Sequence, residues 1–100
     1  MSHSLTVALI QQCCSGDTAA NLETQTRDIR RAATAGARLI LLQELHNTLY
    51  FCQVEDPALC DLAEPIPGPT TERLGALAQE LGVVIVASLF ERRAAGLYHN

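Results

Sequence analysis

The segment Leu39–Leu42 constrains the fold of this chain most, because it is an apolar run that does not alternate with polar residues. Such a run predicts a strand covered on both faces, as in a parallel sheet. Glu44 follows two residues later, where that strand should end. In open α/β sheets, ligands bind in the crevice beyond the carboxyl ends of the strands, so Glu44 is a candidate site residue.

Two interpretations of Glu44 are open from the residues alone. A carboxylate half-removed from water at the end of a strand could serve as a general base. The same carboxylate could instead pair with an arginine or cap a nearby helix.

A first βαβ unit is predicted around this run. Leu5–Ile10 is short and almost entirely apolar, which indicates a buried strand. A helix is expected from Thr18 to Ala35, with Asp17 as its N-cap and Gly36 as the glycine that ends it. The apolar stripe expected on this helix consists of Leu22, Ile29, Ala32 and Ala33. The two flanking strands should therefore be parallel.

After a long connection from Glu44 to Glu64, the second half of the chain again predicts a helix followed by a strand. Pro69 opens a second predicted helix with an apolar stripe, and Gly82 ends it. Val83–Leu89 predicts a third buried strand, and Glu91–Gly96 a polar hairpin turn. The result is an α/β chain, βαβαβ, with largely parallel strands. Two helices can cover only one face of such a sheet, so residues 1–100 are expected to be the N-terminal segment of a larger domain, truncated at the start of a strand.

Composition excludes several classes of function. The formal net charge is −4 and basic residues do not cluster, so neither nucleic acid nor a membrane is an expected partner. The four cysteines lack the spacing of metal ligands, and no metal is expected. Free thiols without a secretory signal favour a cytoplasmic protein.

Several segments together resemble a known family. They are Val7–Gln11, Cys14–Ser15, Ala35–Ala37 leading into Leu39–Leu45, Tyr50–Gln53, Ala63–Pro65, Gly68–Thr70, Leu81–Val84, Ser88–Glu91 and Leu97–Asn100. The chain resembles the N-terminal part of a nitrilase-superfamily carbon–nitrogen hydrolase. The Tyr50–Gln53 block makes it similar, within that superfamily, to the N-carbamoylputrescine amidases.

This resemblance implies a fold, a chemistry and an assembly. The fold is an α-β-β-α sandwich that forms homo-oligomers, and the catalytic groups are a glutamate, a lysine and a cysteine with no cofactor. The glutamate falls on Glu44, the general base that takes the proton of the cysteine thiol. The sequence contains no lysine, and none of its cysteines matches the nucleophile, so residues 1–100 alone are expected to be inactive.

The implied reaction is hydrolysis of a linear ureido or amide C–N bond, converting N-carbamoylputrescine to putrescine, ammonia and carbon dioxide. Related substrates, 3-ureidopropionate or an ω-amide, remain alternatives. A diamine-derived substrate needs an anion for its far ammonium, which Glu55, Asp56 or a group outside the chain could supply. A non-catalytic α/β binding module is the remaining class, although the first strand is not followed by a phosphate-binding glycine loop.

Other residues near Glu44 carry open alternatives. His46 is either a second proton-transfer group or a loop or interface histidine. Tyr50 either hydrogen-bonds the substrate or packs its ring with the hydroxyl in water. Cys52 is either redox-sensitive or an inert thiol, and Asn100 could orient the loop around Glu44.

The chain also departs from its apparent relatives close to the predicted base. His46 and Asn47 stand where those relatives often carry an aromatic and a short polar or acidic residue, and Leu49 stands where a proline is common. Because substrate-facing residues follow the catalytic glutamate, these departures bear on the substrate more than on the chemistry.

Overall fold

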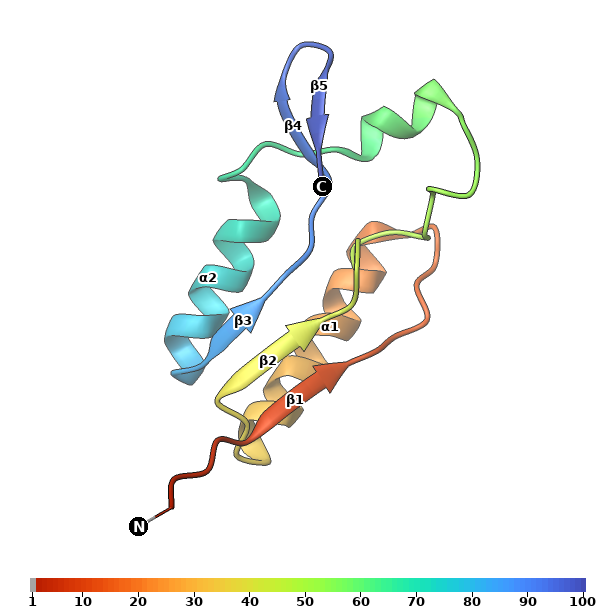
Figure 1. Ribbon diagram of the computed structural model, residues 1–100. Coiled ribbons are helices and arrows are strands. Elements are labelled where there is room, and N and C mark those ends of the chain that lie inside the picture. The colour runs from red at the N-terminus through yellow and green to blue at the C-terminus, as the bar shows by residue number, and fades with distance from the viewer. Residues whose placement is uncertain (1) are drawn as a thin grey trace.

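The computed structural model describes residues 2–100 (Figure 1). The elements, in chain order, are β1 (Val7–Ile10), α1 (Thr18–Thr34), β2 (Leu39–Leu42), a 3₁₀ helix (Pro57–Leu62), α2 (Pro69–Leu81), β3 (Val84–Val86), β4 (Glu91–Ala94) and β5 (Leu97–His99). The expected βαβαβ order is confirmed, although β3 is shorter than the apolar run that predicted it. Within residues 2–100, no helix is both long and apolar enough to cross a membrane.

The main sheet has three strands in the order β1-β2-β3, and both pairings are parallel, as predicted. In the middle of the sheet, Ile40 of β2 lies opposite Ala8 of β1 and Ile85 of β3. The strands β4 and β5 form a separate antiparallel hairpin. The predicted hairpin is therefore present, but most of its expected turn is strand β4.

Helix ends follow the predicted signals. The Asp17 carboxylate accepts a hydrogen bond from the Ala20 amide at 3.1 Å, which satisfies one of the free N–H groups of the first turn of α1. Gly82, the C-cap of α2, adopts the left-handed conformation with φ of 64°. Glycine reaches this conformation without the steric cost of a Cβ atom.

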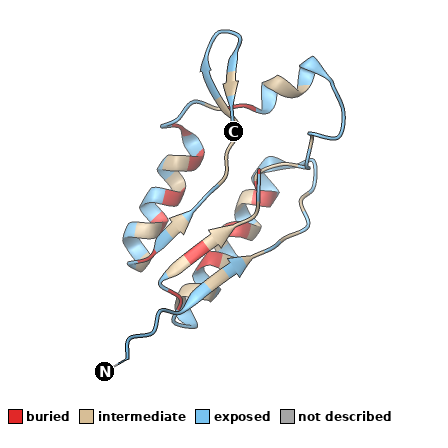
Figure 2. Cartoon of the chain, in the orientation of Figure 1, coloured by how far each residue is buried: buried red, intermediate tan, exposed pale blue. Residues whose placement is uncertain are grey.

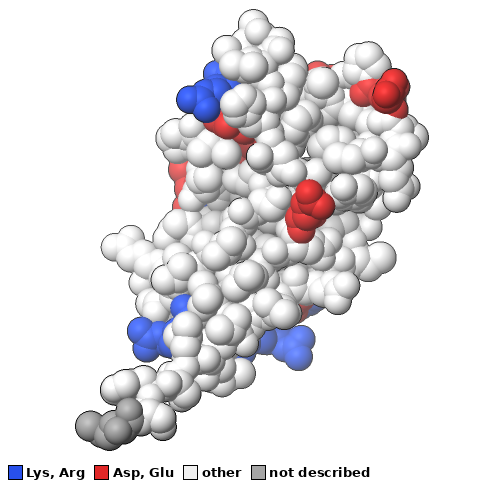
Figure 3. Space-filling model, in the orientation of Figure 1, with Lys and Arg blue, Asp and Glu red and all other residues white. Residues whose placement is uncertain are grey.

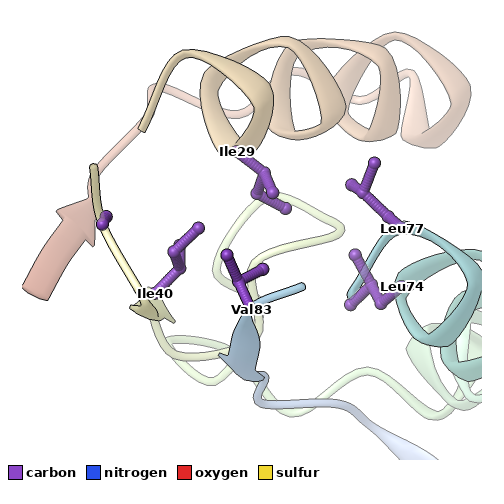
Figure 4. Packing of buried hydrophobic residues seen from close by; sticks show 6 residues of the cluster. Ile29, Ile40, Leu74, Leu77 and Val83 are labelled. Carbon is purple, nitrogen blue, oxygen red and sulfur yellow. The ribbon is translucent and has the colours of Figure 1, made fainter. Parts of the chain in front are cut away.

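The core lies between the two helices and one face of the sheet. Ile29 of α1 and Leu74 and Leu77 of α2 point toward Ile40 and Val83 (Figure 4). Ile29 and Ile40 are completely inaccessible to solvent. Both helices therefore cover the same face.

The opposite face of the sheet is not covered by any described residue. Leu9 is 77% exposed and Val84 61% exposed, while Val7 and Val86 are each 47% exposed. Figure 2 shows exposed and half-buried residues on all three strands and a buried segment only on β2, and Figure 3 shows few charged groups on the surface over them. Parallel sheets are normally covered on both faces, so this apolar face is the surface on which the expected second layer of a sandwich would pack.

One prediction about α1 is wrong in its first half. Leu22 was expected on the buried stripe, but the buried side chains are Asn21, Gln25 and Ile29. These three are spaced by four residues and share one face of the helix. The N-terminal turns of α1 pack on the polar turn after β2 and not on the apolar sheet, so polar side chains are buried there.

Two glycines, Gly68 at the N-cap of α2 and Gly75 inside it, give a test of the packing at this helix. A Cβ atom on Gly68 would overlap the carbonyl oxygen of Pro65, whereas a Cβ on Gly75 would meet nothing within 4 Å. We expect Gly68→Ala to destabilise the full-length protein by about 1–3 kcal/mol. Gly75→Ala, at an exposed position inside the helix, should be neutral or stabilising by up to about 1 kcal/mol. Urea unfolding of both variants measures the difference, and equal stabilities would contradict the packing described for Gly68.

Candidate active site

Glu44 lies where the sequence placed it, immediately beyond the carboxyl end of β2. The expectation that its side chain is half-removed from water is wrong for the described residues, because Glu44 is exposed. Within residues 2–100, Asn100 and Tyr50 lie beside the carboxylate and leave it open to solvent. No arginine forms an ion pair with Glu44 among the described residues, so the structural alternative of an Arg–Glu pair is not observed there.

A chain of hydrogen bonds connects Glu44 to the end of β3 and to Asn100. The backbone N–H of Leu45 donates to Ser88 Oγ at 3.1 Å, and Ser88 Oγ donates to Asn100 Oδ1 at 3.2 Å. The side-chain amide of Asn100 in turn donates to Glu44 Oε1 at 3.3 Å. The contact suggested for Asn100 is therefore present. Ser88, which was not predicted as a site residue, connects Asn100 to the backbone of Leu45.

Tyr50 and Cys52 lie near the same carboxylate. The negative charge of Glu44 is the largest cause that raises the pKa of the Tyr50 hydroxyl, and Cys52 adds to the effect. Tyr50 is itself 50% exposed. Glu44, Tyr50 and Cys52 thus form one accessible group of polar atoms beyond β2.

The backbone at Glu44 is held in an unusual turn. Leu45 has a φ of +49°, in the left-handed region that residues other than glycine rarely adopt. Such a conformation costs roughly 1–3 kcal/mol and persists only where surrounding contacts enforce it. Leu45 is only 4% exposed, so the packing around it helps to hold this conformation. The turn directs Glu44 outward and the next two residues inward.

His46 is one of these inward residues. Its side chain is 1% exposed, and burial lowers its pKa to about 4, with Asn47 opposing the shift in part. Its Nδ1 lies 2.8 Å from Gln25 Oε1. A buried imidazole that is neutral at pH 7 and bonded to an amide does not exchange protons readily near neutrality. The structure therefore favours the loop-histidine interpretation over a proton-transfer role.

Glu55 and Asp56 lie along a neighbouring surface hollow of about 480 Å³. Its other lining residues are mostly apolar: Phe51, Cys52, Val54, Pro57, Leu59, Cys60 and Phe90. Asp56 caps the 3₁₀ helix, because its Oδ1 accepts from the Ala58 amide at 3.0 Å. Glu44 does not line this hollow, but Cys52 both lines it and lies beside Tyr50.

The cysteines show no metal site. All four are free thiols, and no group of three or more histidine, cysteine, aspartate or glutamate side chains within residues 2–100 could hold a metal ion. Cys13 and Cys52 are exposed, whereas Cys14 and Cys60 are half-buried. Cys14 contacts the turn after β2, since its Sγ donates to the backbone oxygen of His46 at 3.3 Å.

Comparison with known proteins identifies the family. Residues 6–100 match the family described as carbon-nitrogen hydrolase, and the chain belongs to that family. It is 42% identical over 97 residues to an N-carbamoylputrescine amidase from Solanum lycopersicum, covering 96% of this chain and 32% of that protein. It is 34% identical over 98 residues to a citrullinase from Francisella tularensis, covering 97% of this chain and 34% of that protein.

A solved structure supports the fold. A carbon-nitrogen hydrolase from Helicobacter pylori matches with a TM-score of 0.88 and 37% identity, over 96% of this chain and 33% of that chain. The predicted α/β nitrilase-type fold is thus confirmed for this segment. The chain spans about a third of the length of the relatives it matches.

Proposed function

We propose that this chain forms the first part of a carbon–nitrogen hydrolase that cleaves a linear ureido C–N bond, with Glu44 as the general base. The observation that carries the proposal is a carboxylate at the carboxyl end of β2, accessible and hydrogen-bonded to Asn100, in a chain of this family. Glu44 is exposed within residues 2–100, so burial gives no support to its role as a base. Its position at the strand end does.

The proposed mechanism needs two groups from outside this chain. Glu44 would remove the proton from a cysteine thiol, and the thiolate would attack the ureido carbon. The protonated Glu44 would return that proton to the leaving nitrogen as the C–N bond breaks and the amine departs. A lysine ammonium would stabilise the oxyanion of the tetrahedral intermediate. Water activated by the same carboxylate would then hydrolyse the carbamoyl thioester, which frees the thiol and carbamic acid, and the carbamic acid would decompose to ammonia and carbon dioxide. Since the sequence holds no lysine, residues 1–100 alone should show no turnover.

The substrate we propose is N-carbamoylputrescine, as in the name of the Solanum lycopersicum relative. A ureido group at one end of an aliphatic chain and an ammonium at the other would suit apolar walls beside a carboxylate. The hollow next to Cys52 offers such walls, with Glu55 and Asp56 on its rim. Asp56 already caps a helix, so Glu55 is the better partner for the far ammonium.

The experiment compares substrates on the full-length protein. Ammonia release is measured with N-carbamoylputrescine, citrulline, 3-ureidopropionate and an ω-amide. The proposal expects the highest kcat/KM for N-carbamoylputrescine. A preference for 3-ureidopropionate or the ω-amide would contradict the proposed substrate and leave the proposed reaction in place. Inactivity on all four compounds would favour a non-catalytic binding module.

A single variant tests the role of the hollow in specificity. Glu55→Gln should raise the KM for N-carbamoylputrescine about 10-fold or more with little change in kcat, since the far ammonium would lose its charged partner. The same variant should leave the KM for 3-ureidopropionate unchanged. An equal effect on both substrates would contradict the assignment of Glu55. Asp56→Asn, which keeps an oxygen able to cap the helix, serves as the matched control.

The assembly of the protein and its location are proposed from the family resemblance and from the free thiols, respectively. We propose that its subunits assemble into homo-oligomers and that it works in the cytoplasm, where four free cysteines would stay reduced.

A further inference from the structure

The turn after β2 is held by α1 through backbone carbonyls. The Gln25 side-chain amide donates to the backbone oxygen of His46, and the Asn21 side-chain amide donates to the backbone oxygen of Asn47 at 3.0 Å. Asn21 and Gln25 are one helical turn apart on the face of α1 that is buried. Two successive carbonyls that follow the left-handed Leu45 are therefore bound by two successive turns of one helix.

Gln25 holds His46 at two points. Besides its bond to the His46 carbonyl, Gln25 places Oε1 2.8 Å from His46 Nδ1. A carbonyl oxygen only accepts, so the NH₂ group of Gln25 must face it and Oε1 must face the imidazole. The proton of the neutral ring therefore sits on Nδ1, and Nε2 is left as an acceptor. Gln25 thus fixes the backbone, the ring orientation and the tautomer of His46 together.

This arrangement is costly if it serves stability alone. Gln25 is completely buried, His46 is 1% exposed, and His46 Nε2 has no hydrogen-bond partner within residues 2–100. Two apolar side chains of similar size would fill the same space without burying the unpaired Nε2, and would leave the His46 carbonyl with only the weak Cys14 Sγ donor at 3.3 Å. Apolar side chains could not, however, bind the His46 carbonyl, and that carbonyl lies two residues from Glu44. The polar pair is therefore suited to defining one conformation of the turn.

We propose that Gln25 and His46 are positioning residues for Glu44. Their paired hydrogen bonds hold the turn at Leu45 in its left-handed conformation, and this turn sends the Glu44 carboxylate to the edge of the sheet while the following residues point inward. The inference rests on the proposed role of Glu44 as general base. It does not require His46 to touch the substrate or to carry protons.

The kinetic test uses the full-length protein and three variants. His46→Leu should lower kcat about 10- to 100-fold with KM within about threefold, since a misplaced base affects the chemical step more than binding. His46→Asn should restore kcat to within about threefold of wild type, because its amide nitrogen can stand near the position of Nδ1 and donate to Gln25. Gln79→Ala, an exposed change on α2, is the control and should leave both constants unchanged.

A spectroscopic measurement on the unmodified protein keeps the test independent of variant folding. Selective ¹⁵N-histidine labelling, assigned with His46→Asn, should show His46 with its proton on Nδ1 at pH 7. Gln25→Met should abolish that preference and speed hydrogen exchange of the amides of residues 45–48. A proton on Nε2, unchanged exchange, or kcat that Asn does not rescue would each overturn the positioning role.

The outcomes separate this inference from the proposed function. If Glu44→Gln keeps its activity while the Nδ1 tautomer and the exchange changes are observed, the general-base proposal fails and the geometry of the turn stands, without a catalytic purpose. If Glu44→Gln is inactive and His46→Leu is fully active, the positioning role fails alone.

Discussion

Glu44→Gln is expected to lower kcat of the full-length hydrolase by about 10²–10⁴-fold, the usual contribution of a general base. Glutamine has the same shape and keeps an oxygen to accept from the Asn100 amide, which donates to Glu44 at 3.3 Å. Its amide, however, cannot accept a proton from a thiol. Because Glu44 is exposed, the free energy of unfolding should change by less than about 0.5 kcal/mol.

Two measurements check this result. Steady-state kinetics give the loss in kcat. The rate at which iodoacetamide alkylates the nucleophilic cysteine, followed on its own peptide because Cys13 and Cys52 are also exposed thiols, reports whether the nucleophile still loses its proton. Both rates should fall together in Glu44→Gln. The control is Glu72→Gln, an exposed carboxylate in the first turn of α2, which should leave both rates unchanged. Turnover within tenfold of wild type would rule out the general-base role.

The position of Glu44 could be predicted because it depends only on local sequence. An apolar run of strand length ends two residues before it, and parallel strands present their carboxyl ends at one edge. The same logic missed Ser88, because the apolar run Val83–Leu89 predicted a strand through this position, whereas β3 ends at Val86, two residues before it. Its contact with the Leu45 amide follows from adjacent strands ending together.

The exposure of Glu44 and the burial of Gln25 could not be predicted in this way. Both depend on which segments lie over them, and that is a matter of contacts between residues distant in sequence. Gln25 has the hydropathy of a solvated helix position, and its hydrogen bonds to the backbone oxygen and the Nδ1 atom of His46, 21 residues away, make its burial favourable. Periodicity therefore placed Leu22 on the buried stripe of α1 and missed the polar face that begins at Asn21.

The uncovered face of the sheet leads to a second prediction, which concerns the stability of the full-length protein. Ile40 is completely buried between β1, β3 and the two helices, so Ile40→Ala should destabilise the full-length protein by about 2–5 kcal/mol. Leu9 is 77% exposed within this chain, on the face that no described residue covers. If a second sheet packs there, as an α-β-β-α sandwich requires, Leu9→Ala should cost about as much as Ile40→Ala.

Urea unfolding of the two variants separates the possibilities, with Gln79→Ala as an exposed reference. Both substitutions remove a side chain of equal carbon number from a parallel strand, β1 at the edge of the described sheet and β2 at its centre, so a large loss at Leu9 requires a covering layer on its face. A large loss for Ile40→Ala with less than about 0.5 kcal/mol for Leu9→Ala would mean that this face stays in solvent. Equal losses would mean that the exposed strands seen here are the interior of the complete domain, and that Glu44 stands at the mouth of a two-layered structure.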